Sequence, residues 1–164
     1  MRKHDVVIIG GSLSGASCAI ALRGGGIDVG VFERDNFPRE KVCGEFLSPG
    51  TVRAFKQIGV LNDVLDAGAI RVDRGRIRSG NHTIEIPFSE PALGFSRARL
   101  DALLAGRAGV EHGCLAESVR RDAGVFITEI SGPSGRFEVS SKVIVDAAGK
   151  LSRFTHRLQT SHYG

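Results

Sequence analysis

Six consecutive positions, Gly10 to Gly15, combine residue types that suit phosphate binding, with the sequence GGSLSG. They follow a short, apolar, β-branched run, Val6 to Ile9, which is typical of a strand buried in a parallel sheet. In a G-x-G-x-x-G pattern the first glycine makes the turn, the second admits a phosphate to the backbone, and the third lets the helix pack closely. The pattern therefore predicts that unpaired amide N–H groups, at the start of a helix running to about Arg23, bind a dinucleotide diphosphate.

Ser12 occupies the middle position of this pattern, in place of its second glycine. Its Cβ and hydroxyl stand where a diphosphate favours bare backbone. The hydroxyl either donates a hydrogen bond to the phosphate or weakens its binding, and the sequence leaves both open.

Glu33 ends a second apolar run, Ile27 to Phe32, at roughly the 20-residue spacing at which such folds bind a ribose 2′-OH. FAD and NAD carry this hydroxyl on the adenosine, whereas NADP carries a phosphate that Glu33 would repel, even with Arg34 beside it. The sequence therefore predicts FAD or NAD. The alternative is a plain parallel strand with a surface acid at its tip.

Three buried strands must position these groups, and we expect them near residues 5–9, 28–33 and 142–146. Segments at 114–121, 124–131 and 136–140 predict an antiparallel β-meander that covers one face of their sheet. The predicted fold class is α/β, a Rossmann-like FAD/NAD(P)-binding fold with a parallel sheet core and an inserted meander.

The segment between these strands has its own elements. Residues 35–50 form a polar loop, followed by a helix that Ser48 caps and Pro49 begins, and a short helix near residues 62–67. Residues 71–79 and 83–88 predict a hairpin, on which Arg74, Arg76 and Arg78 form either a cationic binding surface or a solvated face. Ser96 is expected to cap a further helix, whose buried side carries Leu100, Leu103, Leu104 and Ala108.

Composition excludes several classes of protein. The net charge of +4 is spread along 164 residues, which does not indicate a nucleic-acid partner. No apolar run reaches the ~20 residues that span a bilayer, so we expect a cytoplasmic protein without a membrane span. Three distant cysteines and scattered histidines indicate no disulfide and no metal site.

Four features in order give a resemblance that spans roughly residues 5–154: the glycine turn with Glu33, the loop PREKVCGEFLSP, the Arg-x-x-Leu of Arg97 to Leu100, and the strand VIVDAAG. The chain resembles the FAD-dependent oxidoreductase superfamily of aromatic hydroxylases, flavin halogenases and geranylgeranyl-reductase-like enzymes. The resemblance implies FAD as cofactor, NAD(P)H as electron donor and a small-molecule substrate, apolar or carrier-bound.

The same resemblance implies the residues that hold FAD. The diphosphate would lie on the turn, the adenosine ribose on Glu33, the adenine beside Arg34, the flavin side along the loop, and the ribityl-diphosphate near Arg97. The cofactor-binding residues implied are Gly10, Gly11, Ser12, Ser14, Gly15, Glu33, Arg34, Arg39, Lys41, Cys43, Gly44, Arg97, Asp146, Ala148 and Gly149.

Two departures qualify the resemblance. Aromatic hydroxylases carry Ala-Asp-Gly where this chain has Ala147-Ala148-Gly149, which favours the reductase and halogenase branches over hydroxylation. Members of the superfamily also run to about twice this length. We therefore expect residues 1–164 to be a truncated FAD-binding domain that lacks the C-terminal Gly-Asp motif and the substrate domain, and that binds FAD weakly.

Two alternatives remain: an NAD-dependent dehydrogenase module, which the long loop after the second strand disfavours, and a non-catalytic nucleotide-binding fragment. No catalytic acid or base is assigned. Cys43 is either a thiol stabilised as thiolate beside Lys41 or an unreactive loop cysteine. Cys18 is expected in the core, and Asp101 on the surface or paired with an arginine.

Overall fold

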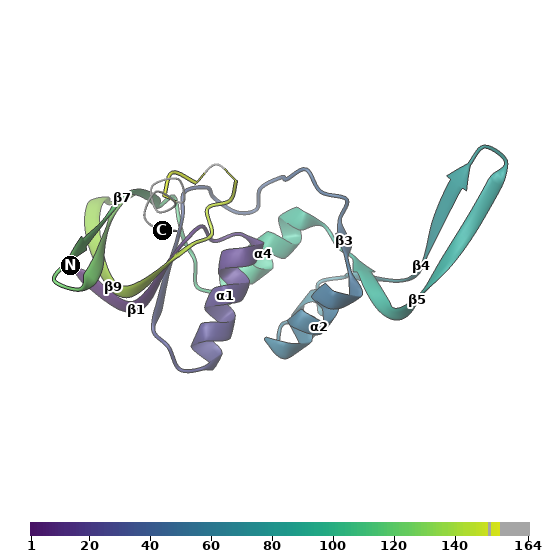
Figure 1. The fold of residues 1–164 in the computed structure, drawn as a ribbon, viewed down its shortest axis with the longest axis horizontal. Coiled ribbons are helices and arrows are strands. Elements are labelled where there is room, and N and C mark those ends of the chain that lie inside the picture. Colours follow the sequence, from purple (N-terminus) through teal and green to yellow (C-terminus); the bar gives the residue numbers. More distant parts are fainter. Residues whose placement is uncertain (151, 155–164) are drawn as a thin grey trace, which may run out of the picture.

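A computed structural model of the chain describes residues 1–150 and 152–154. Its main sheet has six strands in the order β6-β2-β1-β9-β8-β7 (Figure 1). The strands are β1 Arg2–Ile9, β2 Val29–Glu33, β6 Glu111–His112, β7 Leu115–Asp122, β8 Val125–Gly132 and β9 Gly135–Asp146. Strands β2 and β9 flank β1 and run parallel to it, with Ile8 opposite Val31 on one side and Val145 on the other. The predicted parallel core is confirmed.

Two helices, α1 Leu13–Gly24 and α4 Arg97–Arg107, pack beside this core. The small residues Ala16 and Ala19 are fully buried, which lets α1 lie close to Val6 and Ile8 of β1. Leu104 of α4 belongs to the same apolar cluster. The prediction that this helix buries its leucine side is therefore confirmed.

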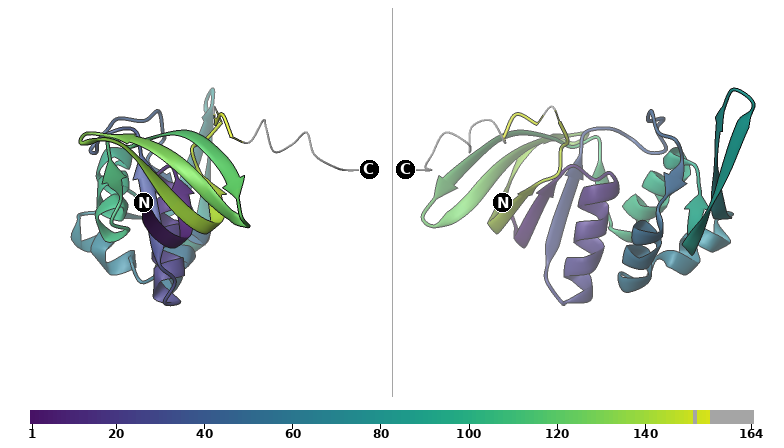
Figure 2. Two further views of the ribbon diagram at one scale, coloured as in Figure 1. Left: turned by 90° about the vertical axis from the view of Figure 1, so that its left-hand side faces the viewer. Right: turned by 45° about the vertical axis from the view of Figure 1, so that its right-hand side comes forward.

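The antiparallel meander is a continuation of the main sheet, which curls as Figure 2 shows. Ala116 and Ile130 of the meander pack with Val7 and Ile9 on the side of β1 opposite α1, so the meander covers that face as predicted. The expected break between residues 136–140 and 142–146 was wrong. Strand β9 runs unbroken because its first half pairs with β8 while Val139–Asp146 pairs with β1.

A second unit consists of helices α2 Pro49–Gln57 and α3 Leu61–Asp66 and a sheet with the order β3-β5-β4. Its strands are β3 Phe46–Leu47, β4 Ile70–Ser79 and β5 His82–Gly94. The Ser48 hydroxyl caps α2 by accepting from Thr51 N–H at 3.3 Å, as predicted. Ser96 stands at the N-cap of α4 but its side chain makes no capping bond, so that part of the prediction was wrong.

The predicted hairpin of β4 and β5 is confirmed and extends away from the rest of the molecule (Figure 1). Arg74 and Arg76 both pair across the strands with Glu85, which fits the interpretation of a solvated charged face. Ile77 and Ile84 lie opposite each other and are largely exposed.

The packing of α4 predicts the effect of shortening one side chain. Leu104→Ala should lower the free energy of unfolding by about 2–5 kcal/mol, because Leu104 is fully buried and its loss leaves a cavity. Urea unfolding measures this value. Leu65→Ala on α3 is the control, since Leu65 is 42% exposed, and it should cost less than about 1 kcal/mol. Equal losses for both variants would contradict the packing described.

Candidate cofactor-binding site

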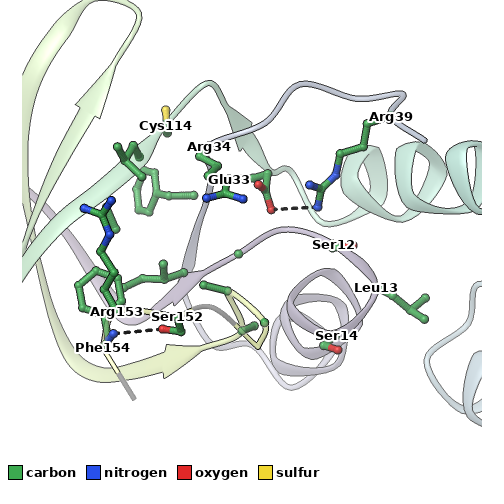
Figure 3. Close-up of a pocket in the computed structure, with 18 of the residues that line it drawn as sticks. Ser12, Leu13, Ser14, Glu33, Arg34, Arg39, Cys114, Ser152, Arg153 and Phe154 are labelled. Atoms are coloured by element: carbon green, nitrogen blue, oxygen red, sulfur yellow. Dashed lines mark hydrogen bonds and ion pairs between the residues drawn. The ribbon is translucent and has the colours of Figure 1, made fainter. Parts of the chain in front are cut away.

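The glycine turn opens into a cleft of about 370 Å³ at the edge where β1, β2 and β9 end (Figure 3). In doubly wound sheets, ligands bind outside the carboxyl ends of the strands. The cleft is lined by Ile9, Gly10, Ser12, Leu13, Ser14, Phe32, Glu33, Arg34, Arg39, Lys41, Arg97, Cys114, Leu115, Ala116, Ala147, Ala148, Gly149, Ser152, Arg153 and Phe154.

The turn from β1 into α1 leaves no room for side chains at its glycines. Gly10 has a φ of 99°, and a Cβ there would lie 2.5 Å from the Ala147 carbonyl oxygen. A Cβ at Gly15 would lie 1.8 Å from the Gly10 carbonyl oxygen, and one at Gly11 would lie 2.4 Å from Val110 Cγ1. At Gly10 and Gly15 the clashing atoms belong to the backbone, so the turn requires glycine at these two positions.

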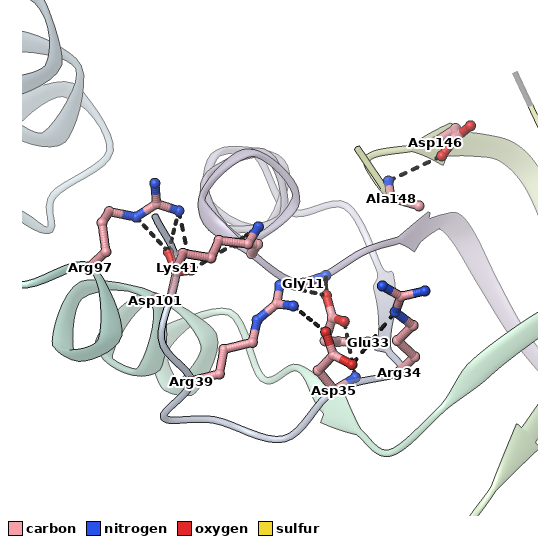
Figure 4. Close-up of polar contacts among 11 residues, drawn as sticks. Gly11, Glu33, Arg34, Asp35, Arg39, Lys41, Arg97, Asp101, Asp146 and Ala148 are labelled. Atoms are coloured by element: carbon pink, nitrogen blue, oxygen red, sulfur yellow. Dashed lines mark hydrogen bonds and ion pairs between the residues drawn. The ribbon is translucent and has the colours of Figure 1, made fainter. Parts of the chain in front are cut away.

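Glu33 lies at the end of β2 and is buried against the turn (Figure 4). Its Oε2 accepts a hydrogen bond from Gly11 N–H at 2.9 Å, and its Oε1 accepts one from Asp35 N–H at 3.1 Å. Arg39 Nη2 lies 3.8 Å from Oε2. Each carboxylate oxygen has a second lone pair, so Glu33 can hold the turn and still accept from a ribose hydroxyl.

Ser12 does not point its hydroxyl along the helix it precedes. Its Oγ donates to Asp101 Oδ2 at 2.8 Å and accepts from Lys41 Nζ at 3.3 Å. Asp101 also accepts from Arg97, whose Nη2 lies 3.1 Å from Oδ1. Asp101 is thus paired with an arginine as predicted, but it is buried rather than on the surface.

Arg97 lies between this carboxylate and the loop cysteine. Its Nη1 lies 3.8 Å from Cys43 Sγ, so Arg97 rather than Lys41 is the cation at this thiol. Desolvation lowers the pKa of Arg97, but its contacts with Cys43 and Asp101 outweigh this effect and raise the pKa above its usual value. The guanidinium therefore stays charged beside the cleft.

The remaining loop residues divide between the cleft and its surroundings. Arg34 and Arg39 line the cleft, and Arg39 pairs with Asp35 while its guanidinium lies 5.4 Å from the Phe37 ring. Cys43 is exposed and lies outside the cleft lining. Gly44 also lies outside, in a shallow depression lined in part by Ser96 and Arg99.

The end of β9 forms the opposite border of the cleft, where Ala148 and Gly149 lie. Asp146 does not line the cleft but shapes its border, since its Oδ1 accepts from Ala148 N–H at 3.1 Å and its Oδ2 accepts from Ser152 Oγ. Gly11 and Gly15 likewise shape the turn rather than line the cleft. The other predicted site residues meet at the cleft.

Several cleft residues were missed by the sequence analysis. Asp101, which lies behind the cleft lining, was predicted to pair with an arginine but not to hold Ser12. Leu13 and Phe32 were assigned only to their helix and strand. No local signal identifies Cys114, Leu115, Ala116, Ser152, Arg153 and Phe154, which the curl of the sheet and the end of β9 bring to the cleft.

Cys114 is a buried thiol directly before β7, while Cys18, expected in the core, is half-buried beside the main apolar cluster. Burial raises the pKa of Cys114 above its ordinary 9.0, with a further contribution from Glu111, so the thiol is neutral at physiological pH. Over residues 1–150 and 152–154 no group of three or more His, Cys, Asp or Glu could hold a metal ion. No helix in that part is long and apolar enough to cross a membrane.

The crowding at the turn predicts a contrast between two glycines of α1. Gly15→Ala should lower the free energy of unfolding by about 1–3 kcal/mol, because the new Cβ meets the Gly10 carbonyl and forces the backbone to shift. Gly24→Ala, with nothing within 4 Å of the added Cβ, should leave stability unchanged or raise it. Urea unfolding of both variants makes the comparison, and a stable Gly15→Ala protein would refute the turn geometry.

The burial of Cys114 predicts an alkaline loss of stability. The folded pKa lies above the unfolded value, so the stabilisation is present below pH 9.0 and is lost as the pH rises through the folded pKa. Urea unfolding below and above pH 9.0 should show a steeper decline for the wild-type protein than for Cys114→Ala. Parallel declines would show that the thiol does not contribute.

Comparisons with known proteins agree with this geometry. A family model described as an FAD binding domain matches residues 3–158. A 1H-pyrrole-2-carbonyl-[peptidyl-carrier protein] brominase from Pseudoalteromonas luteoviolacea is 29% identical over 157 residues, which cover 91% of this chain and 38% of the brominase. A menaquinone reductase from Mycolicibacterium smegmatis is 33% identical over 91 residues, covering 56% of this chain and 22% of the reductase.

Solved structures give the same result. A flavoprotein/dehydrogenase from Cytophaga hutchinsonii superposes with a TM-score of 0.82 at 25% identity, over 90% of this chain and 40% of that protein. The flavin-dependent brominase Bmp2 superposes with a TM-score of 0.77 at 27% identity, over 90% of this chain and 38% of the brominase. The chain thus spans about two fifths of these proteins. Because the family model covers nearly all of its residues, the chain belongs to the FAD binding domain family.

Proposed function

We propose that this chain is the cofactor-binding part of a flavin-dependent oxidoreductase of the reductase or monooxygenase type, with NAD(P)H as electron donor. The observation that carries the proposal is the cleft at the glycine turn. A Cβ at Gly10 or Gly15 would clash with the backbone of the turn, and the first-turn amides of α1, which no side chain caps, would bind an anion there.

The charges of the cleft also fit a dinucleotide diphosphate. Its charged lining side chains are one carboxylate, Glu33, and the cations Arg34, Arg39, Lys41, Arg97 and Arg153. A cleft in which cations outnumber carboxylates attracts anionic ligands. Arg39 Nε is buried and has no hydrogen-bond partner within the described part of the chain, so this donor is unsatisfied without a ligand.

Each part of the cleft has a role in this proposal. The α1 amides and Lys41 hold the diphosphate, Glu33 accepts from the adenosine ribose, and Arg97 lies toward the ribityl-diphosphate. Ala148 and Gly149 border the cofactor without side chains that would obstruct it. When bound, FAD supplies the capacity to accept and release electrons, while the chain binds and orients it.

The substrate we propose is a small molecule, apolar or bound to a carrier protein. The similarity to a brominase and a chlorinase of pyrrole-carbonyl groups on peptidyl-carrier proteins supports the carrier-bound form. The similarity to squalene epoxidase and menaquinone reductase supports the apolar form. The three free cysteines fit a reducing compartment such as the cytoplasm.

Incubation with FAD, removal of free ligand by desalting and visible absorbance test the proposal. The chain should retain flavin, and FAD fluorescence should be quenched on titration. Retention of NAD but not FAD would instead support the NAD-dependent dehydrogenase. A folded chain that retains neither nucleotide would contradict the proposed cofactor site.

Substitution of Lys41 tests its proposed contact with the FAD diphosphate. Lys41→Met should weaken FAD binding by about 10-fold to 150-fold, because a hydrogen bond from a charged donor, worth about 1.5–3 kcal/mol, is lost. The control is Lys56→Met on α2, an exposed lysine outside the cleft, which should leave affinity unchanged. Fluorescence titration of both variants measures the change, and equal affinities would remove Lys41 from the site.

A further inference from the structure

Ser12 stands at the N-cap of α1 but does not behave as a cap. A serine at this position ordinarily accepts a hydrogen bond from an amide two or three residues on, here Ser14 or Gly15. The Ser12 backbone is extended, with φ −76° and ψ −166°, as an N-cap requires, yet its side chain makes no capping bond. The hydroxyl instead donates to Asp101 Oδ2 at 2.8 Å.

Asp101 is held in place to receive this hydroxyl. It is 0% exposed on α4, a helix that packs against α1. Arg97, one turn earlier, donates to it from Nε at 3.3 Å and from Nη2 at 3.1 and 3.2 Å. Arg97 therefore fixes the orientation of the carboxylate (Figure 4), and Oδ2 accepts from both Arg97 and Ser12.

We propose that Asp101 is a positioning residue that draws the Ser12 hydroxyl away from the first-turn amides of α1 and so keeps them free for the FAD diphosphate. The inference rests on the proposed cofactor site. It explains how a residue with a hydroxyl can stand in place of the second glycine of the pattern. Without Asp101, the hydroxyl would cap α1 and compete with the phosphate for the same amides.

Amide hydrogen exchange, followed by ¹⁵N NMR on the chain without nucleotide, tests this role directly. Asp101→Asn should slow exchange at Ser14 or Gly15 about fivefold, because the released Ser12 hydroxyl then caps the helix. In Ser12→Ala/Asp101→Asn no hydroxyl is present, so the slowing should disappear. A purely structural role would speed exchange along α4 and α1 without protecting these two amides.

Fluorescence titration with FAD gives the second readout. Asp101→Asn should weaken FAD binding about fivefold to tenfold in the wild-type background and less in the Ser12→Ala background, because the competing hydroxyl is absent there. Asp63→Asn is the matched control, since Asp63 pairs with Arg107 of α4 at 3.0 Å outside the cleft. This variant should change neither the exchange rates of the Ser14 and Gly15 amides nor the affinity for FAD.

Unchanged exchange at Ser14 and Gly15 in a folded Asp101→Asn protein would overturn the inference. If Asp101→Asn does not fold, Asp101→Glu moves the carboxylate by one methylene and permits the same comparison. Asp101→Asn can slow exchange at Ser14 or Gly15 while the wild-type chain fails to bind FAD. That result would uphold the positioning role of Asp101 and refute the proposed cofactor site. Failure of the positioning role and failure of the proposed cofactor site therefore give different results.

Discussion

The close approach between the Gly15 backbone and the Gly10 carbonyl oxygen sets the geometry of this molecule. A Cβ at Gly15 would lie 1.8 Å from that oxygen, so the chain can reverse from β1 into α1 only where side chains are absent. The turn places the start of α1 at the edge where β1, β2 and β9 all end. Helix amides and strand ends therefore meet at one cleft, and every other cleft residue is arranged around it.

Two buried carboxylates hold this turn from opposite sides. Glu33 accepts from the Gly11 amide and has Arg39 beside it, while Asp101 accepts from the Ser12 hydroxyl and pairs with Arg97. A buried carboxylate is stable only when hydrogen bonds and a counter-charge compensate its desolvation, and both have them. Arg39 and Arg97 line the cleft together with Glu33, whereas Asp101 lies behind its surface.

The curl of the main sheet provides the far side of the cleft. Strand β9 belongs to the parallel core over Val139–Asp146 and to the meander over its first half, so the two parts are mechanically continuous. This continuity brings Cys114 and Ala116 next to Phe32, which lies at the end of β2. The cleft is consequently bordered by residues far apart along the chain.

Local sequence determined the parallel strands, the glycine turn, the helices and the hairpin, because each depends on side-chain period and backbone freedom over a few residues. It also determined the candidate residues Glu33, Lys41 and Arg97, since they belong to short motifs. Only the tertiary structure decided the unbroken course of β9, the burial of Asp101 and the orientation of Ser12 toward it. These features arise from packing between α1 and α4 and from pairing between distant strands, and neither leaves a local pattern in the sequence.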